Sequence, residues 1–127
     1  MGGLVIDVII LAIFRFFRRV YRVRQARSWP TTIAATLDWS TRYAEGEYKH
    51  SRDDLQIEAK LSYEVNGEPL IGFIRSDGLN QASIEKFFDK LPKPQEIVIR
   101  YSPENPIRIR ALNDDNRGKV PFELAVD

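Results

Sequence analysis

The chain has 127 residues, about the length of one domain, with no cysteine and a single histidine, His50. These counts exclude a disulfide framework, a thiolate metal site, a cysteine nucleophile and any site that needs several histidines. The net charge of +1 conceals an uneven distribution. Residues 1–27 contain six arginines and one acid, whereas residues 28–127 carry a net charge of −4. This asymmetry indicates that the basic part meets a membrane or a nucleic acid.

The first predicted element is a helix that is apolar in its first half and amphipathic in its second. Residues 4–17 read LVIDVIILAIFRFF, in which Asp7 and Arg15 are the only charged side chains. Four arginines at helical spacing then share one face, opposite an apolar face. As a helix, residues 4–24 would extend roughly 31 Å, close to the ~30 Å of a hydrocarbon core, but the purely apolar part is shorter. The helix is therefore expected either to span a membrane or to lie in its interface.

We interpret residues 1–27 as a membrane anchor, with aromatic rings at the interface and arginine side chains reaching lipid phosphates. The side chains predicted to contact the membrane are Leu4, Ile6, Ile9, Ile10, Ile13, Phe14, Phe16, Phe17, Val20 and Tyr21. Those predicted to contact lipid headgroups are Arg15, Arg18, Arg19 and Arg22. Because the basic residues follow the apolar run, the segment does not read as a cleaved signal peptide. The same charges favour an inner or plasma membrane location with the rest of the chain on the cytoplasmic side.

Two other interpretations of this helix stay open. It can pack as a core helix against the rest of the chain or against a partner. Its arginines can also contact nucleic-acid phosphates. A helix that binds DNA does not require so apolar a face, so we expect no nucleic-acid partner.

Residues 28–127 are predicted to form a small β domain that begins with a half-buried strand. Ser28-Trp29-Pro30 ends the helical pattern, because the residue before a proline avoids the helical region. Apolar and polar residues then alternate, which is typical of a strand with one buried face. The residues expected on that buried face are Ile33, Ala35, Leu37, Trp39 and Tyr43. Residues 44–54 read as a polar loop.

The remaining elements alternate between strand and helix signals. Leu55–Val65 has strict alternation, and Asn66-Gly67 predicts a tight hairpin turn into a strand over about residues 69–75. Helical spacing follows over residues 81–91, with Asn80 as the expected N-cap and an apolar stripe made by Ile84, Phe87, Phe88 and Leu91. Further strands are predicted at 96–101 and 107–112, with 120–126 as an edge strand or a trailing tail.

The expected fold class is α+β and mainly β. An N-terminal membrane-associated helix precedes a small antiparallel sheet or barrel-like domain that packs one helix. We expect one face of the sheet to be covered by that helix and the other to be solvated, because the alternation is clean. Basic residues that can line the solvated face are Arg42, Lys60, Arg75, Arg100, Arg108 and Arg110.

Three short motifs stand out in the β domain: Trp-Pro before the first strand, Tyr-x-Val-Asn-Gly at the hairpin, and Tyr-Ser-Pro-Glu-Asn-Pro after the 96–101 strand. The residues that carry them are Trp29, Pro30, Tyr63, Asn66, Gly67, Tyr101, Pro103, Asn105 and Pro106. Behind an apolar, basic-flanked N-terminus, this pattern resembles the domain of unknown function family 3592. Members are largely bacterial and carry one or two membrane segments beside a small β domain. The resemblance implies that fold and membrane association, and it implies no activity.

No arrangement of residues predicts catalysis or a cofactor. His50 and the adjacent pairs Asp53-Asp54 and Asp114-Asp115 read as solvated loop or turn residues, since none has metal-loop spacing. Glu58 and Glu64 flank Lys60 on one strand face, which indicates a mixed-charge surface. We therefore expect no enzyme, no bound metal and no cofactor.

The sequence favours a non-enzymatic, membrane-anchored β domain that acts as an accessory or protein-interaction subunit of a membrane complex. Its expected partners are membrane lipid and an integral membrane protein or complex. The alternative is a soluble β domain that binds a small ligand, with the N-terminal helix mediating self-association.

Overall fold

The computed structural model describes residues 3–43, 55–76, 78–90, 93–117 and 119–127, apart from the side chains of residues 3–8, 11 and 43. The predicted polar loop with His50, Asp53 and Asp54 lies outside these residues, as does Leu91 of the predicted helical stripe.

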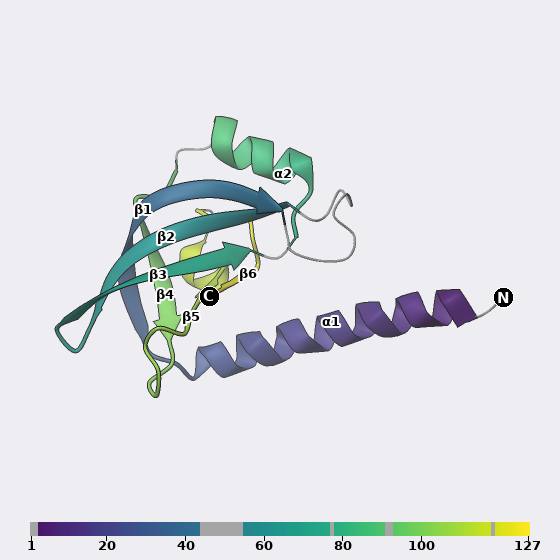
Figure 1. Cartoon of the computed structure of the whole chain (residues 1–127), viewed down its shortest axis with the longest axis horizontal. Helices are drawn as coiled ribbons and strands as arrows, with labels where there is room; N and C mark the ends of the chain where they lie inside the picture. The colour runs from purple at the N-terminus through teal and green to yellow at the C-terminus, as the bar shows by residue number, and fades with distance from the viewer. Residues whose placement is uncertain (1–2, 44–54, 77, 91–92, 118) are drawn as a thin grey trace.

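The body of the molecule is a closed six-stranded antiparallel barrel with the strand order β1-β2-β3-β6-β5-β4. The strands are β1 (Thr31–Tyr43), β2 (Leu55–Val65), β3 (Glu68–Ser76), β4 (Glu96–Tyr101), β5 (Ile109–Leu112) and β6 (Leu124–Val126). The helices are α1 (Gly3–Arg27), α2 (Gln81–Glu85), which continues into a π-helical turn over Lys86–Lys90, and a 3-10 turn at Asp114–Asn116. In Figure 1, α1 extends from the barrel as a long rod, and α2 lies on the other side of the barrel.

The mainly β prediction is confirmed, and the barrel alternative of the expected sheet-or-barrel domain is the one observed. Inward-facing side chains of β2, β4 and β5 form the main core, and Phe122 from the segment before β6 completes it. The strict alternation of β2 is confirmed: Ile57, Ala59, Leu61 and Tyr63 are buried. The turn at Asn66 and Gly67 has φ of 54° and 81°, which is the conformation that the Asn-Gly pair favours.

The prediction for β1 is wrong for the first half of the strand. Ile33 and Leu37 are 62 % and 53 % exposed and Ala35 is also exposed, whereas Ala34 is fully buried. The cause is a β-bulge, because the pairing with β2 shifts between Thr36 and Asp38. The bulge inserts one extra residue, which reverses the positions that face inward on its two sides. Trp39 lies after the bulge and therefore keeps the expected inward position.

The prediction for the C-terminal segment is also corrected. Leu124–Val126 is neither an edge strand nor a tail, because β6 pairs with β3 on one side and with β5 on the other. This short strand closes the barrel. Its closure removes the open sheet edge that an exposed strand would present.

The predicted second helix is confirmed, and it covers one part of the barrel. The Asn80 Oδ1 accepts a hydrogen bond from the Ser83 N–H at 2.8 Å, as an N-cap does. Ile84 and Phe87 are buried against Ile57 and half-buried Trp39. The rings of Trp39 and Phe87 meet edge-to-face with centroids 5.0 Å apart, so α2 is held by packing of its apolar stripe.

The outer face of the barrel carries an ion-pair cluster in which Glu58 of β2 lies between two arginines. Glu58 Oε2 accepts a hydrogen bond from Arg75 Nε at 2.7 Å and lies 3.3 Å from Arg42 Nη1. The hydrogen bond from Arg75 is the largest cause that lowers the pKa of Glu58, and burial opposes it. The mixed-charge surface predicted for this strand is therefore confirmed here, with Glu64 and Lys60 exposed on the same face.

Glu58→Gln is expected to lower the free energy of unfolding by about 1 kcal/mol near neutral pH. A carboxylate whose folded pKa lies below its ordinary value of 4.5 stabilises the fold above that value and loses this contribution as pH falls through the folded pKa. The stability difference between the two proteins should therefore shrink under acid conditions. Urea unfolding across an acidic pH series measures it. Glu64→Gln on the same strand face is the control, and an equal effect there would contradict the prediction.

Candidate functional site

The last turn of α1 is docked on the barrel by a small apolar cluster. Ala26 and Trp29 are buried against Leu112 of β5 and Leu124 of β6, with Val23 and Val126 half-buried beside them. Trp29 is therefore a junction residue that packs on the sheet. The helix is therefore attached to the barrel through its C-terminal end, while its N-terminal part extends away (Figure 1).

Arginines from the barrel complete this docking by reaching the carbonyl groups at the end of the helix. Arg100 Nη1 donates to the Arg27 carbonyl at 2.9 Å, and Arg110 Nη1 donates to the Arg22 carbonyl at 2.7 Å. The Arg27 carbonyl lies in the last turn, where carbonyls lack an intrahelical partner and the helix end has a partial negative charge, so a cationic donor stabilises it. The Arg22 carbonyl lies one turn earlier. These contacts fix the direction in which α1 leaves the barrel.

Arg100 and Arg110 do not line an open sheet face as predicted. Arg100 forms a two-pronged ion pair with Asp115, with contacts of 2.7 and 3.0 Å, and this pair raises the pKa of Arg100. Arg110 is 4 % exposed, and its guanidinium lies 4.5 Å from the centre of the Trp29 ring. Burial is the main cause that lowers the pKa of Arg110. Because the barrel is closed, these two arginines lie at the junction between α1 and the barrel and not on an open sheet face.

The prediction that Asp114 and Asp115 are both solvated turn residues is wrong for Asp115. Its side chain is only 15 % exposed because of the pair with Arg100. Asp114 is exposed as expected, and its Oδ2 lies 3.0 Å from Arg27 Nη2 at the end of α1. Both aspartates therefore contribute to the helix junction.

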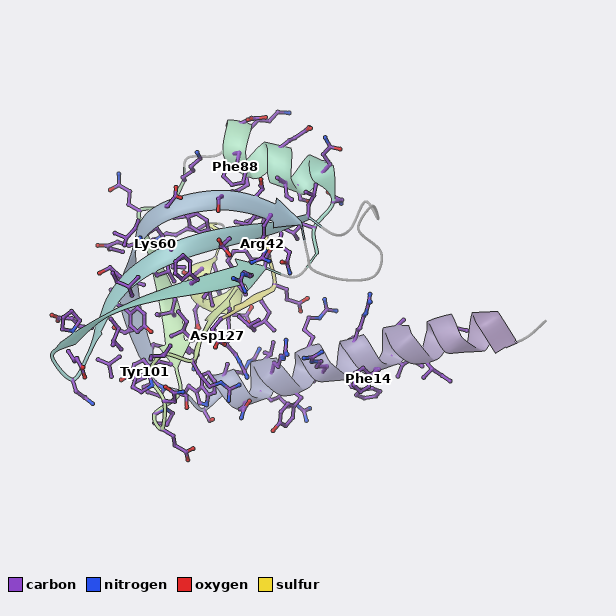
Figure 2. The ribbon with its side chains drawn as sticks, viewed as in Figure 1. Phe14, Arg42, Lys60, Phe88, Tyr101 and Asp127 are labelled. Atoms are coloured by element: carbon purple, nitrogen blue, oxygen red, sulfur yellow. The ribbon has the colours of Figure 1, made fainter. Side chains whose placement is uncertain are left out.

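Beyond the junction, α1 exposes a row of large apolar side chains. Ile10, Phe14, Phe17 and Tyr21 follow one another at helical spacing, and each is more than half exposed. Figure 2 shows Phe14 on the side of α1 that points away from the barrel. Helical geometry places Ala26, which packs on the barrel, well away from this row. We call Ile10, Phe14, Phe17 and Tyr21 the apolar row.

The structure brings most of the predicted membrane-contacting residues together on the protruding part of α1. Ile9, Ile13 and Phe16 are exposed beside the apolar row, and Val20 is half-buried. The side chains of Leu4 and Ile6 are not among those that the structure describes. The predicted headgroup residues Arg15 and Arg18 are exposed, while Arg19 and Arg22 are half-buried near the junction. No helix in the described part of the chain is both long and apolar enough to cross a bilayer.

A second exposed apolar feature lies on the outer face of the barrel. The bulge in β1 leaves Ile33 and Leu37 outside, and β3 presents Ile71 and Phe73, of which Ile71 is 60 % exposed. Lys60 and Ser62 of β2 separate the two strands, since Lys60 pairs with Phe73 and Ser62 with Ile71. We call Ile33, Leu37, Ile71 and Phe73 the outer patch. The sequence did not predict this patch: Ile33 and Leu37 were expected on the buried face because the bulge was not recognised, and no face was assigned to β3.

Two hydrogen bonds connect residues of the predicted motifs. Tyr63 is buried, and its hydroxyl donates to the Pro106 carbonyl at 2.8 Å. The Tyr101 N–H donates to the Pro30 carbonyl at 3.1 Å, which joins the end of β4 to the start of β1. Burial raises the pKa of Tyr63. These contacts give the motifs a structural role at a corner of the barrel.

Among the described residues, no group of three or more His, Asp and Glu side chains could hold a metal ion. No family model, no curated protein and no solved structure matches the chain. The resemblance to domain of unknown function family 3592 therefore stays a prediction.

Proposed function

We propose that this chain is a non-enzymatic barrel domain held at a membrane surface by α1, where it acts as an accessory or interaction subunit. One observation supports this most: Phe14 lies on the side of α1 away from the barrel (Figure 2), and helical spacing places Ile10, Phe17 and Tyr21 on the same side. A helix that lies in the interface buries such a row in the acyl boundary and keeps its cationic side in the headgroup layer. With α1 in that position, the barrel stays on the aqueous side.

The arginine distribution supports the same placement. Arg15, Arg19 and Arg22 project from a part of the helix surface that the apolar row does not occupy, as their spacing requires. Near an anionic lipid surface, each contributes about 1 kcal/mol. The proposed side of the membrane is the cytoplasmic one, because that leaflet is anionic.

The interaction role draws on the outer patch. Isolated exposed apolar residues are common, but pairs on two strands of one sheet are a more specific contact surface. The partner we propose is a protein embedded in the same membrane, because α1 would keep the barrel at the bilayer surface. This is the accessory function that the sequence favours.

Co-sedimentation with vesicles of an anionic phospholipid tests the anchor. The double variant Phe14→Glu/Phe17→Glu is expected to lose at least about tenfold in binding, because each buried phenylalanine contributes roughly 1.5–3 kcal/mol. Both side chains are exposed, so the barrel should unfold at the temperature of the native protein. Ile107→Glu, at an equally exposed position (60 %) in the loop before β5, is the control and should bind as the native protein does.

Two outcomes would contradict the anchor: no binding of the native protein to anionic vesicles, or equal binding of the double variant. The same variant also examines self-association. If the native chain forms dimers without lipid, and Phe14→Glu/Phe17→Glu makes them monomers, the apolar row is a contact between copies. That result would favour the soluble alternative.

A further inference from the structure

An open groove of about 250 Å³ runs along α1 where the helix meets the segment before β6. It is distinct from the apolar row and opens on another side of the helix. Three apolar side chains, three arginines and one acid line it: Phe16, Val20, Val23, Arg19, Arg24, Arg27 and Glu123. An apolar surface bordered by cations is suited to a molecule that has an apolar chain and an anionic head.

The charges of the groove favour an anion. Arg19 Nη1 lies 3.5 Å from Glu123 Oε2, and Arg27 pairs with Asp114 outside the groove. Glu123 and Asp114 are 69 % and 72 % exposed, so these pairs are weak and can be exchanged. Arg24 forms no ion pair within the described part of the chain. Three arginines against Glu123 leave the groove with an excess of positive charge.

We propose that this groove binds a single anionic amphiphile. Its phosphate or carboxylate head pairs with Arg24 and Arg27, and its chain lies along Phe16 and Val20. The inference rests on the proposed membrane function for the source of that molecule, which is a lipid of the bilayer on which α1 lies. A soluble amphiphile carries the same chemistry, so the experiment separates the two sources.

The position of the groove explains why a bilayer lipid reaches it. Val20 and Phe16 lie beside the apolar row on the helix surface, while Glu123 belongs to the barrel. A helix that lies in the interface therefore places the groove at the junction of bilayer and barrel. A lipid headgroup bound there would contact the arginines of α1 beside the barrel.

Calorimetric titration with dihexanoyl phosphatidic acid, kept below its micelle concentration, tests the groove without a bilayer. Binding is expected for this probe, with much weaker binding of inorganic phosphate and of dihexanoyl phosphatidylcholine. Arg24→Gln should weaken binding about tenfold, because it removes a charge-assisted hydrogen bond. Glu123→Gln should tighten it about threefold, because it removes a repelling carboxylate.

Two control variants remove a charge of the same sign at positions outside the groove. Lys86→Gln beside α2 and Glu104→Gln in the turn after β4 are both at exposed positions and should leave the affinity within about twofold. Equal effects of Arg24→Gln and Lys86→Gln would overturn the groove and leave only a general charge effect. Phosphate alone binding as tightly as the amphiphile would overturn the role of the apolar wall.

The two proposals fail in different ways. If the soluble probe binds but anionic vesicles do not, the membrane anchor is wrong and the groove serves a soluble amphiphile. If vesicles bind but the probe does not, the groove proposal is wrong and the anchor stands. If both hold, Phe14→Glu should weaken vesicle binding while it keeps the affinity for the probe within about twofold, because position 14 lies about 15 Å along the helix from Arg24.

Discussion

Replacement of Asn116 by alanine is expected to lower the free energy of unfolding by about 3 kcal/mol, because three hydrogen bonds of a buried amide are lost at once. Asn116 is 3 % exposed. Its Oδ1 accepts from the Val98 N–H at 2.7 Å, and its Nδ2 donates to the carbonyls of Val98 and Leu112 at 2.8 and 2.9 Å. The alanine variant leaves these backbone groups without their partner inside the barrel wall.

The size of this effect follows from the topology around β4. Its pairing with β1 covers Glu96–Arg100, but its pairing with β5 involves only Arg100 and Tyr101. The amide of Asn116 therefore takes the place of a neighbouring strand for Val98. Urea unfolding of Asn116→Ala measures the loss. Asn105→Ala, an exposed asparagine in the turn after β4, should stay within about 0.5 kcal/mol of the native protein. A similarly small change at Asn116 would contradict the prediction.

The second large effect is expected at Arg110, where α1 joins the barrel. Arg110→Ala should lower the free energy of unfolding by about 2–4 kcal/mol, since it removes the bond to the Arg22 carbonyl, the contact with the Trp29 ring and the buried aliphatic stem. The last turn of α1 should then open more often. Hydrogen exchange of the amides of residues 23–29 reports that opening directly.

A second substitution separates charge from packing at this position. Arg110→Met keeps most of the buried volume and removes the cation, and it also removes the buried Nε, which has no hydrogen-bond partner among the described residues. We expect Arg110→Met to cost less stability than alanine while it still speeds exchange of the helix end. Arg108→Ala, at the exposed neighbour in sequence, should change neither quantity. Unchanged exchange in Arg110→Ala would show that the apolar cluster alone holds α1.

Local sequence signals predicted several elements of this fold well, and each has a local physical cause. The alternation of β2 matches its burial because no bulge interrupts the strand. The turn at Asn66 and Gly67 needs positive φ, which these two residues adopt readily. The cap at Asn80 needs a hydrogen bond to a residue three positions later. In all three cases the deciding interaction lies within a few residues along the chain.

The errors arose where residues distant in sequence decide the outcome. The bulge at Leu37 depends on how β1 pairs with both β2 and β4, so alternation alone placed Ile33 on the wrong face. Asn116 lies in a polar turn, and no local pattern indicates that its amide fills a gap beside β4. A basic residue in a strand such as Arg110 usually faces water.

The candidate site divides in the same way. The sequence by itself determined that the first segment is an apolar helix with arginines on one side, because helical spacing fixes which side chains share a face. Only the tertiary structure decided which way that helix points. The docking of Ala26 and Trp29, with the contacts of Arg100 and Arg110 to helix carbonyls, joins residues more than seventy positions apart. These long-range contacts turn the apolar row away from the barrel and form the groove beside it, and nothing in the spacing of the helix residues alone specifies either.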